Sequence, residues 1–367
     1  MNIDLDNLDD LALGTAFIST GGGGDPYLYQ LALHAAIVDK GPVPLIAPDD
    51  LDDDATIMSM GGVGAPMIGS EKLPNGFEGV CAVRKLEEYT GVTCDALIAA
   101  EIGGGNGLVP LLTGLHMGIP VVDADGMGRA YPATQMETFS IYGISATPMS
   151  AVDEFGNGAV ITAADSTTAE RIVRQVGLAM GGHCMAADHV MSGRDVKAYG
   201  VRNTVSLSAK LGRAVRQSKD LAELLVTTCP LLVDAGYGAP VNLFEGKVID
   251  VRREMVGGYD VGEFVIGSFD DRQQMTINVQ NEYLIAIVNG SCVATVPDLI
   301  CVIDRETLLP ITSERLRYGL RICVIGIPAP ALYKTPQAMA FTDPRAFGFD
   351  LDYTEMVTRA PPSSGSD

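Results

Sequence analysis

The sequence predicts an N-terminal α/β domain with a mainly parallel sheet, followed by a β-rich domain that is barrel- or sandwich-like. Three observations support this prediction of the fold. The chain has 367 residues, which is more than one ordinary hydrophobic core takes up. Helix-type and strand-type patterns alternate over roughly the first 165 residues, as in βαβ units. Beyond about residue 243 the apolar runs have the length and alternation of strands.

The first half follows the βαβ rhythm element by element. Leu8, Leu11, Thr15 and Ile18 recur at helical spacing, and the glycines from residue 21 end that helix. Residues 96–100 are continuously apolar, which is typical of a parallel strand covered on both faces. The other expected elements are helices over 26–38, 77–89 and 108–115, and strands over 43–47, 56–60 and 119–122.

The second half begins with a predicted helix over 167–180. Asn289-Gly290 lies between two apolar runs, which is a strong signal for a two-residue β-hairpin turn. We expect strands over 275–279, 284–288, 291–296, 300–303 and 320–325. The predicted units are therefore residues 1–166, residues 167–356, and a flexible Pro- and Ser-rich tail over 357–367.

Charge and composition exclude several classes of partner. The net charge is −21, from 25 basic and 46 acidic side chains, so phosphate backbones and anionic lipid surfaces are repelled. No apolar run reaches about 18 residues, and the first ten residues hold four aspartates and no basic side chain. The seven cysteines form no CxxC pair, which favours reduced thiols. We expect a cytoplasmic protein without nucleic-acid or membrane partners, and its apolar content favours a homo-oligomer.

The segment from Glu101 to Gly107 is the first candidate site. It follows a buried strand and precedes a helix, and ligands of open α/β sheets bind at that edge. Gly103 and Gly104 allow close approach of the backbone, and Asn106 is a helix cap or a donor to a ligand. The alternative is a tight turn without a ligand. A dinucleotide loop is disfavoured because the third glycine of that fingerprint is missing.

Asp123 and Asp125 form the second candidate, at the end of the next strand. Two carboxylates two residues apart project to the same side of an extended chain, as in an acid/base pair or a divalent metal site. Arg129 neutralises one of them or binds substrate, and Glu137 adds another carboxylate. The alternative is structural: Asp123 caps a turn and Asp125 pairs with Arg129. The sequence leaves open whether the pair holds a divalent metal ion, and no other cofactor is indicated.

Two further glycine loops precede or follow predicted elements. Gly22, Gly23 and Gly24 with Asp25 open a helix, and residues 61–65 follow a strand. Asp25 as a helix cap is the structural alternative. Together with residues 103–107 these are three glycine loops at equivalent ends of strands or helices. Their placement indicates one ligand surrounded by backbone. The pairs His183-Cys184 and Asp188-His189 are interpreted as ordinary polar residues, since alternation puts both histidines on one strand face without matched thiolate ligands.

At these motifs the sequence resembles the S-methyl-thiohydantoin desulfurase-like family, found beside hydantoin-utilisation proteins. The matching residues lie over nearly the whole chain, in the stretches 20–26, 101–106, 123–132, 280–282, 296–300, 317–319 and 346–350. The resemblance implies an N-terminal α/β domain and a C-terminal β domain.

The resulting hypothesis is an enzyme that attacks a hydantoin- or thiohydantoin-like ring, or a related cyclic amide, with water. Asp123, Asp125, Arg129 and Glu101 are its expected catalytic residues. Asn281 and Glu282 are expected to reach the substrate from the second domain, because pockets favour domain interfaces. The expected substrate-binding residues are Gly22, Gly23, Gly24, Asp25, Gly103, Gly104, Asn106, Glu137, Asn281 and Glu282. The alternative is a non-catalytic ligand-binding or regulatory partner of a hydantoinase-type enzyme.

Overall fold

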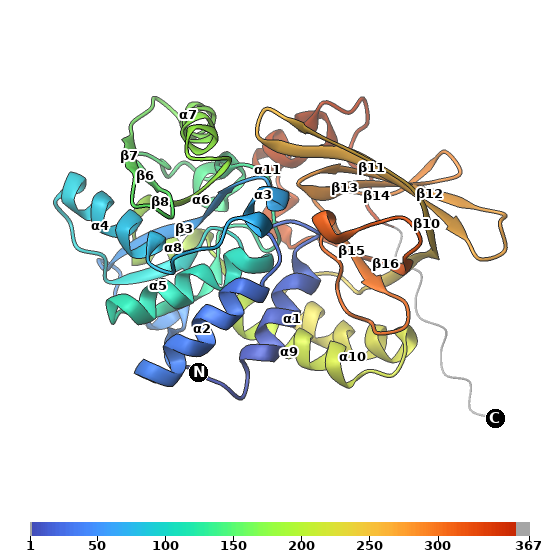
Figure 1. Cartoon of the computed structure of the whole chain (residues 1–367), viewed down its shortest axis with the longest axis horizontal. Coiled ribbons are helices and arrows are strands. Elements are labelled where there is room, and N and C mark those ends of the chain that lie inside the picture. The colour runs from blue at the N-terminus through green and yellow to red at the C-terminus, as the bar shows by residue number, and fades with distance from the viewer. Residues whose placement is uncertain (1, 357–367) are drawn as a thin grey trace.

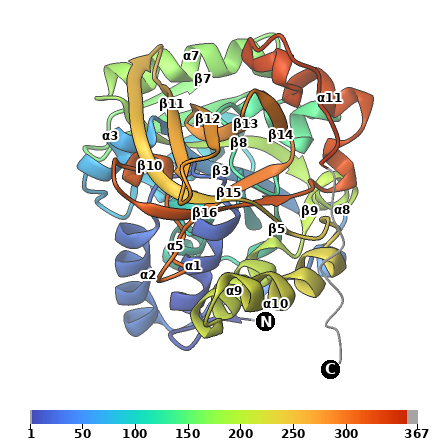
Figure 2. The ribbon, with the colours of Figure 1, turned by 90° about the vertical axis from the view of Figure 1, so that its right-hand side faces the viewer.

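The described residues form two β-sheets. The first sheet and its helices make up an α/β unit, and the second sheet makes up a β-rich unit (Figure 1). The structure is a computed structural model that describes residues 2–356. The predicted tail, residues 357–367, lies outside the described residues. In Figure 2 the strands of the second sheet face the viewer, with α9 (Thr204–Gln217) and α10 (Leu221–Asp234) beneath them.

The first sheet has the strand order β1-β2-β5-β4-β3-β8-β6-β7, with β9 paired to β5. Its centre, β2-β5-β4-β3, is parallel, and the strands added on both sides of it are antiparallel. Its strands are β1 (Asn2–Ile3), β2 (Val43–Ile46), β3 (Thr56–Gly64), β4 (Ala96–Ala99), β5 (Val121–Asp125), β6 (Met149–Val152), β7 (Gly158–Ile161), β8 (His183–Ser192) and β9 (Val201–Arg202).

Helices cover this sheet because its central strands are apolar on both faces. Every residue of β4 and β5 is buried, the two aspartates of β5 included. Helix α1 packs along α9, and α5 packs against α2 and α4. The remaining helices with their bounds are α1 (Leu8–Ile18), α2 (Tyr27–Lys40), α3 (Pro66–Glu71), α4 (Glu78–Thr90), α5 (Val109–Met117), α6 (Thr138–Ile141), α7 (Ser166–Ala179), α8 (Gly193–Tyr199) and α11 (Pro336–Thr342).

The second sheet is antiparallel throughout, in the order β14-β13-β12-β11-β10-β16-β15. The predicted hairpin is confirmed, since Val288 pairs with Ser291 across Asn289-Gly290. The strands are β10 (Val241–Val256), β11 (Tyr259–Ser268), β12 (Gln274–Gln280), β13 (Glu282–Val288), β14 (Ser291–Thr295), β15 (Leu299–Asp304) and β16 (Arg321–Ile327). The α/β unit followed by a β-rich unit is the fold class that the sequence predicts.

The segment that follows residue 166 contributes to both units. Strand β8 pairs with β3 and β6, and β9 pairs with β5, so residues 183–202 complete the first sheet. These strands lie between helices in the sequence and lack a long apolar run, so the alternation over residues 183–189 was the signal available for β8. Their place in the first sheet matters for the site, because β8 supplies two of its side chains.

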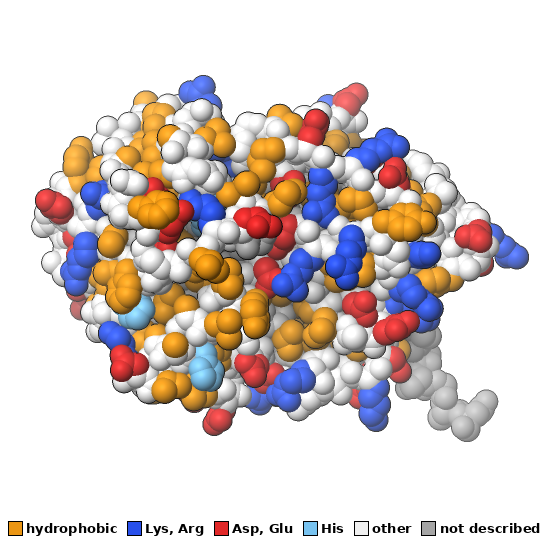
Figure 3. Space-filling view, in the orientation of Figure 1, with side chains coloured by type: hydrophobic (Ala, Val, Ile, Leu, Met, Phe, Trp, Pro, Cys, Tyr) orange, Lys and Arg blue, Asp and Glu red, His pale blue; other side chains and the backbone are white. Residues whose placement is uncertain are grey.

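On the face shown in Figure 3, basic side chains are interspersed with acidic ones and form no continuous stripe. Among residues 2–356, no helix combines the length and apolar character needed to cross a membrane.

Candidate functional site

The three predicted glycine segments meet at one edge of the first sheet, but the third, residues 61–64, is the end of strand β3 and not a loop. Gly105 N–H donates to the Gly24 carbonyl at 2.9 Å, and Asn106 N–H donates to the Gly23 carbonyl at 3.2 Å. The Asn106 side chain reaches the end of β3, where its Oδ1 accepts from Gly62 N–H at 2.8 Å. The loops therefore bind to one another. The N–H groups of Gly105 and Asn106 are engaged in these contacts, so they are not free to stabilise a developing charge on a substrate.

Gly23 is expected to be far less tolerant of a side chain than its neighbour Gly24. Both have a positive φ, +68° and +74°, so alanine costs about 1 to 2 kcal/mol of strain at either position. At Gly23 an added Cβ would also lie 2.1 Å from the Gly103 carbonyl oxygen, whereas at Gly24 it would meet nothing within 4 Å. Overpacking adds about 1 to 3 kcal/mol. Urea unfolding of Gly23→Ala and Gly24→Ala should show the larger loss for Gly23, and equal losses would contradict this packing of the loops.

A cavity of about 290 Å³ opens beside these loops, between the sheet edge and the second unit. Its walls hold eight of the predicted site residues: Gly23, Gly24, Asp25, Glu101, Asn106, Glu137, Asn281 and Glu282. Six predicted residues do not line it: Gly22, Gly103, Gly104, Asp123, Asp125 and Arg129. The carboxylates of the cavity are therefore a different set from the expected aspartate pair.

Glu101 enters the cavity from the end of β4. Its Oε1 accepts from Asn106 Nδ2 at 2.6 Å and its Oε2 accepts from Tyr131 N–H at 3.0 Å. Burial raises the pKa of Glu101 to about 8, although both hydrogen bonds act in the opposite direction. Glu101 is therefore predominantly a neutral acid at pH 7, held in one orientation and facing the cavity.

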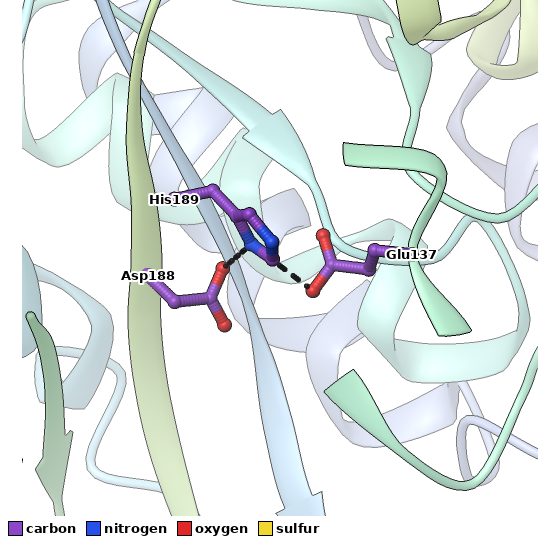
Figure 4. Close-up of side chains that lie close together, drawn as sticks. All are labelled: Glu137, Asp188 and His189. Carbon is purple, nitrogen blue, oxygen red and sulfur yellow. Dashed lines mark hydrogen bonds and ion pairs between the residues drawn. The ribbon is translucent and has the colours of Figure 1, made fainter. Parts of the chain in front are cut away.

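Glu137, Asp188 and His189 form a buried cluster next to Glu101 (Figure 4). His189 Nδ1 lies 2.8 Å from Asp188 Oδ1 and 3.5 Å from Glu137 Oε1. Ser59 Oγ donates to the other Glu137 oxygen, Oε2, at 2.8 Å. Burial, and then the Asp188 carboxylate, raise the pKa of Glu137 well above its ordinary value. Glu137 and Asp188 line the cavity, and His189 lies behind them.

A β-bulge in β8 places Asp188 and His189 on the same side of the strand. Ser59 pairs with Asp188 and Ile57 pairs with Met191, so two residues of β8 oppose one residue of β3 at this point. His189 adopts φ +39°, which is rare for a residue other than glycine. Neighbouring residues of a regular strand point to opposite faces, so the bulge is what allows Asp188 and His189 to contact one another. No residue pattern of the sequence signalled the bulge.

Glu170 and Arg174 of α7 form a fixed wall of the cavity that the sequence did not single out. Their side chains make a buried ion pair, with Arg174 Nη2 2.6 Å from Glu170 Oε1. The other Glu170 oxygen accepts from both the backbone and the hydroxyl of Thr134. Arg174 also donates to the carbonyls of Pro132 and Gly258. The i,i+4 spacing of Glu170 and Arg174 on a predicted helix was the signal available for this pair. It does not identify a buried pair, because exposed ion pairs on helices have the same spacing.

Asn281 and Glu282 reach the cavity from the second unit, as expected. Asn281 Oδ1 accepts from Asp260 N–H at 2.9 Å, which fixes the turn that leads into β13. The Glu282 Oε2 atom is buried and has no hydrogen-bond partner among the described residues. Burial, and then the Glu101 carboxylate, raise the pKa of Glu282 well above its ordinary value. Two acids from different units thus face one another across the cavity.

His183 also lines the cavity. Burial and the nearby Lys72 ammonium lower the pKa of His183 to about 4, so its imidazole is neutral at pH 7. Lys72 donates to the carbonyl of His183 and forms an ion pair with Glu154 at 2.7 Å. His183 therefore offers a neutral imidazole to a ligand in the cavity.

Asp123 and Asp125 lie on β5 but act on the backbone instead of facing the cavity. Asp123 Oδ1 accepts from Ser206 N–H at 2.9 Å, at the first turn of α9, so the capping alternative is the better one. Asp125 Oδ2 accepts from three backbone N–H groups, those of Ile102, Met127 and Gly128. The expected catalytic or metal-binding pair is thus corrected: each carboxylate holds a different segment in place.

Arg129 is also engaged in structure, though not with Asp125. Its guanidinium donates to the carbonyls of Ala130, Asp298, Pro297 and Tyr283 and to the Thr20 hydroxyl, at 2.7 to 3.3 Å. These partners come from both units of the chain. Arg129 therefore joins the two units beneath the cavity, and the expected contact with substrate is not what the geometry favours.

Comparison with known proteins agrees with this fold. The S-Me-THD-like N-terminal domain matches residues 6–163, and the S-Me-THD-like C-terminal domain matches residues 164–356. A crystal structure of a protein from Chromobacterium violaceum superposes with a TM-score of 0.81 at 24% sequence identity, covering 97% of this chain and 99% of the other. At that identity the likeness shows the fold alone. Among curated proteins, nothing matches the chain.

Proposed function

The chain belongs to the S-Me-THD-like family over both of its domains, and from that premise we propose that it is an enzyme. Its proposed reaction is the attack of water on a hydantoin- or thiohydantoin-like ring, or a related cyclic amide, in the cavity between the two units. The cavity of about 290 Å³ lies at the small end of the range of ligand pockets, roughly 300 to 1,000 Å³, which suits a small ring.

One observation supports the proposal most strongly. Glu101, Glu137, Asp188 and Glu282 converge on one cavity, and their environments differ. Glu101 is kept neutral by burial, while Asp188 contacts the imidazole of His189 at 2.8 Å. An acid and a carboxylate with different surroundings are what a hydrolytic reaction needs to run at neutral pH.

In the proposed reaction the two groups move one proton each. Asp188 accepts a proton from water as the water oxygen bonds to the ring carbon. Glu101 gives its proton to the ring nitrogen or sulfur as the bond from that atom to the carbon breaks. Asp188 then returns its proton to solvent and Glu101 is reprotonated, so the net reaction consumes one water molecule. Asn106 is a positioning residue, because its amide holds the Glu101 carboxyl at 2.6 Å.

A substrate panel tests this proposal. The purified protein would be assayed for turnover of hydantoins, S-methyl-thiohydantoins, thiohydantoins and cyclic amides, beside Glu101→Gln. Turnover of one ring class that the variant loses is the expected result. Saturable binding of a ring without turnover would instead favour a ligand-binding partner of a hydantoinase-type enzyme.

The rate should depend on pH through Glu101. Because burial raises its pKa to about 8, the acid form predominates at neutral pH and is lost as pH rises through that value. We expect kcat to fall about tenfold per pH unit well above pH 8. A pH–rate profile measures this, with Glu101→Gln expected to lose that limb. A wild-type rate that stays constant from about pH 7 to 10 would contradict the role of Glu101 as the acid.

A further inference from the structure

The Glu137, Asp188 and His189 cluster has a hydrogen-bond pattern that calls for a positive charge at its centre (Figure 4). Ser140 Oγ donates to Ser166 Oγ at 2.9 Å, and Ser166 Oγ in turn accepts from Ala146 N–H. Ser140 Oγ is therefore able to accept a hydrogen bond from His189 Nε2, which lies 2.8 Å away. In the tautomer with the hydrogen on Nε2, the Nδ1 atom of His189 carries a lone pair.

That lone pair faces two carboxylate oxygens, which repel it. Nδ1 lies 2.8 Å from Asp188 Oδ1 and 3.5 Å from Glu137 Oε1, and all three atoms are buried. In that tautomer a cation among the three atoms would stabilise them, because burial removes the water that would screen them. The cation is either a proton or a metal ion.

The separations of the three atoms fit a metal ion. Ligand atoms that each lie about 2.1 Å from a metal are about 3.0 Å apart at right angles and about 3.4 Å apart at the tetrahedral angle. The observed 2.8 and 3.5 Å lie close to these values, and no pair in the cluster exceeds 4.8 Å.

The surroundings of the cluster also resemble those of metal ligands. A ligating histidine donates its other N–H to an acceptor, which is the place of Ser140 here. Ser59 occupies Glu137 Oε2 and leaves Oε1 for the ion. The left-handed backbone of His189 is kept although it is unfavourable for this residue, and it is this conformation that turns the imidazole toward Asp188.

We propose that Glu137, Asp188 and His189 bind one divalent transition-metal or zinc ion, with its open coordination positions facing the cavity. An imidazole beside two carboxylates favours zinc, cobalt, manganese or iron over magnesium and calcium. Three protein ligands are the number typical of an open site. The binding does not rest on the proposed reaction. If both hold, Asp188 would bind the ion through Oδ1 and keep Oδ2 to accept the proton of the attacking water.

The test uses the full chain, without a purification tag, stripped with a chelator. Calorimetric titration with zinc chloride should show one site. Asp188→Asn and His189→Asn should each weaken binding at least about 100-fold, and Ser140→Ala about 10-fold. Asparagine suits position 189 because it tolerates a positive φ. Glu154→Gln is the matched control, since it removes one charge from the cavity wall without touching the cluster.

Anomalous diffraction from zinc-soaked wild-type crystals locates the ion independently of whether the variants fold. A peak among His189 Nδ1, Asp188 and Glu137 is expected. Zinc and cobalt that bind no better to the wild type than to Asp188→Asn, or a peak elsewhere, would overturn the proposal and leave a proton as the cation of the cluster. If the chelator-stripped protein still turns over the ring substrate, the reaction does not need the metal ion. That result would contradict a role of the ion in the reaction and would not contradict the proposed reaction itself.

Discussion

Asp188→Asn should lower kcat for the true substrate by about 10²- to 10⁴-fold. The replacement keeps the size of the side chain but removes the carboxylate that we propose accepts the proton of water. Asp188 lines the cavity and its only described side-chain contact is His189, so the fold has little reason to change. Steady-state kinetics measure the effect, with circular dichroism to confirm folding.

Asp123→Asn is the matched control for this prediction. Asp123 is the carboxylate that the sequence favours, but it caps α9 and lies outside the cavity. Asparagine caps helices about as well as aspartate, so both stability and kcat should change little. The reverse pattern, with a large loss for Asp123→Asn and none for Asp188→Asn, would show that the chemistry takes place at the end of β5 instead.

Arg129→Met should destabilise the protein by about 3 kcal/mol or more, because several buried carbonyls lose their donor. Arg129 joins Ala130 of the first unit to Pro297, Asp298 and Tyr283 of the second. Lysine would not restore the fold fully, since its single ammonium cannot reproduce the planar fork. Urea unfolding measures the loss.

Arg315→Met is the control for Arg129. Arg315 also lines the cavity and pairs with Asp25, but its own side chain is 64% exposed. Exposed pairs contribute about 0 to 1 kcal/mol, so a small change is expected. Equal losses for the two variants would contradict the role of Arg129 as the link between the units.

Most of the fold follows from local sequence patterns. The apolar run of β4 and the Asn289-Gly290 turn each specify their element through burial or turn chemistry, and both are observed. The glycine loops around residues 21–25 and 103–107 were located correctly, whereas residues 61–64 were expected to be a loop and instead extend β3. β8 was missed because it pairs with β3, which lies more than 100 residues earlier in the chain.

The site was predicted in position better than in chemistry. Glu101, Asn106 and Glu282 line the cavity because they follow or precede strands at the shared edge. Asp123 and Asp125 were misassigned because a sequence does not show which backbone N–H groups a carboxylate will meet. Asp188 and His189 depend on a bulge, which is a property of strand pairing rather than of the local residues.

Isotope labelling tests the central claim most directly. The ring compound that the protein turns over fastest would be converted in water enriched in oxygen-18, and the product analysed by mass spectrometry. Attack by water on the ring carbon predicts one heavy oxygen in the product at that carbon, and a loss of the labelled product in Asp188→Asn. A product without the label, or no turnover of any compound in the panel, would contradict the proposed reaction.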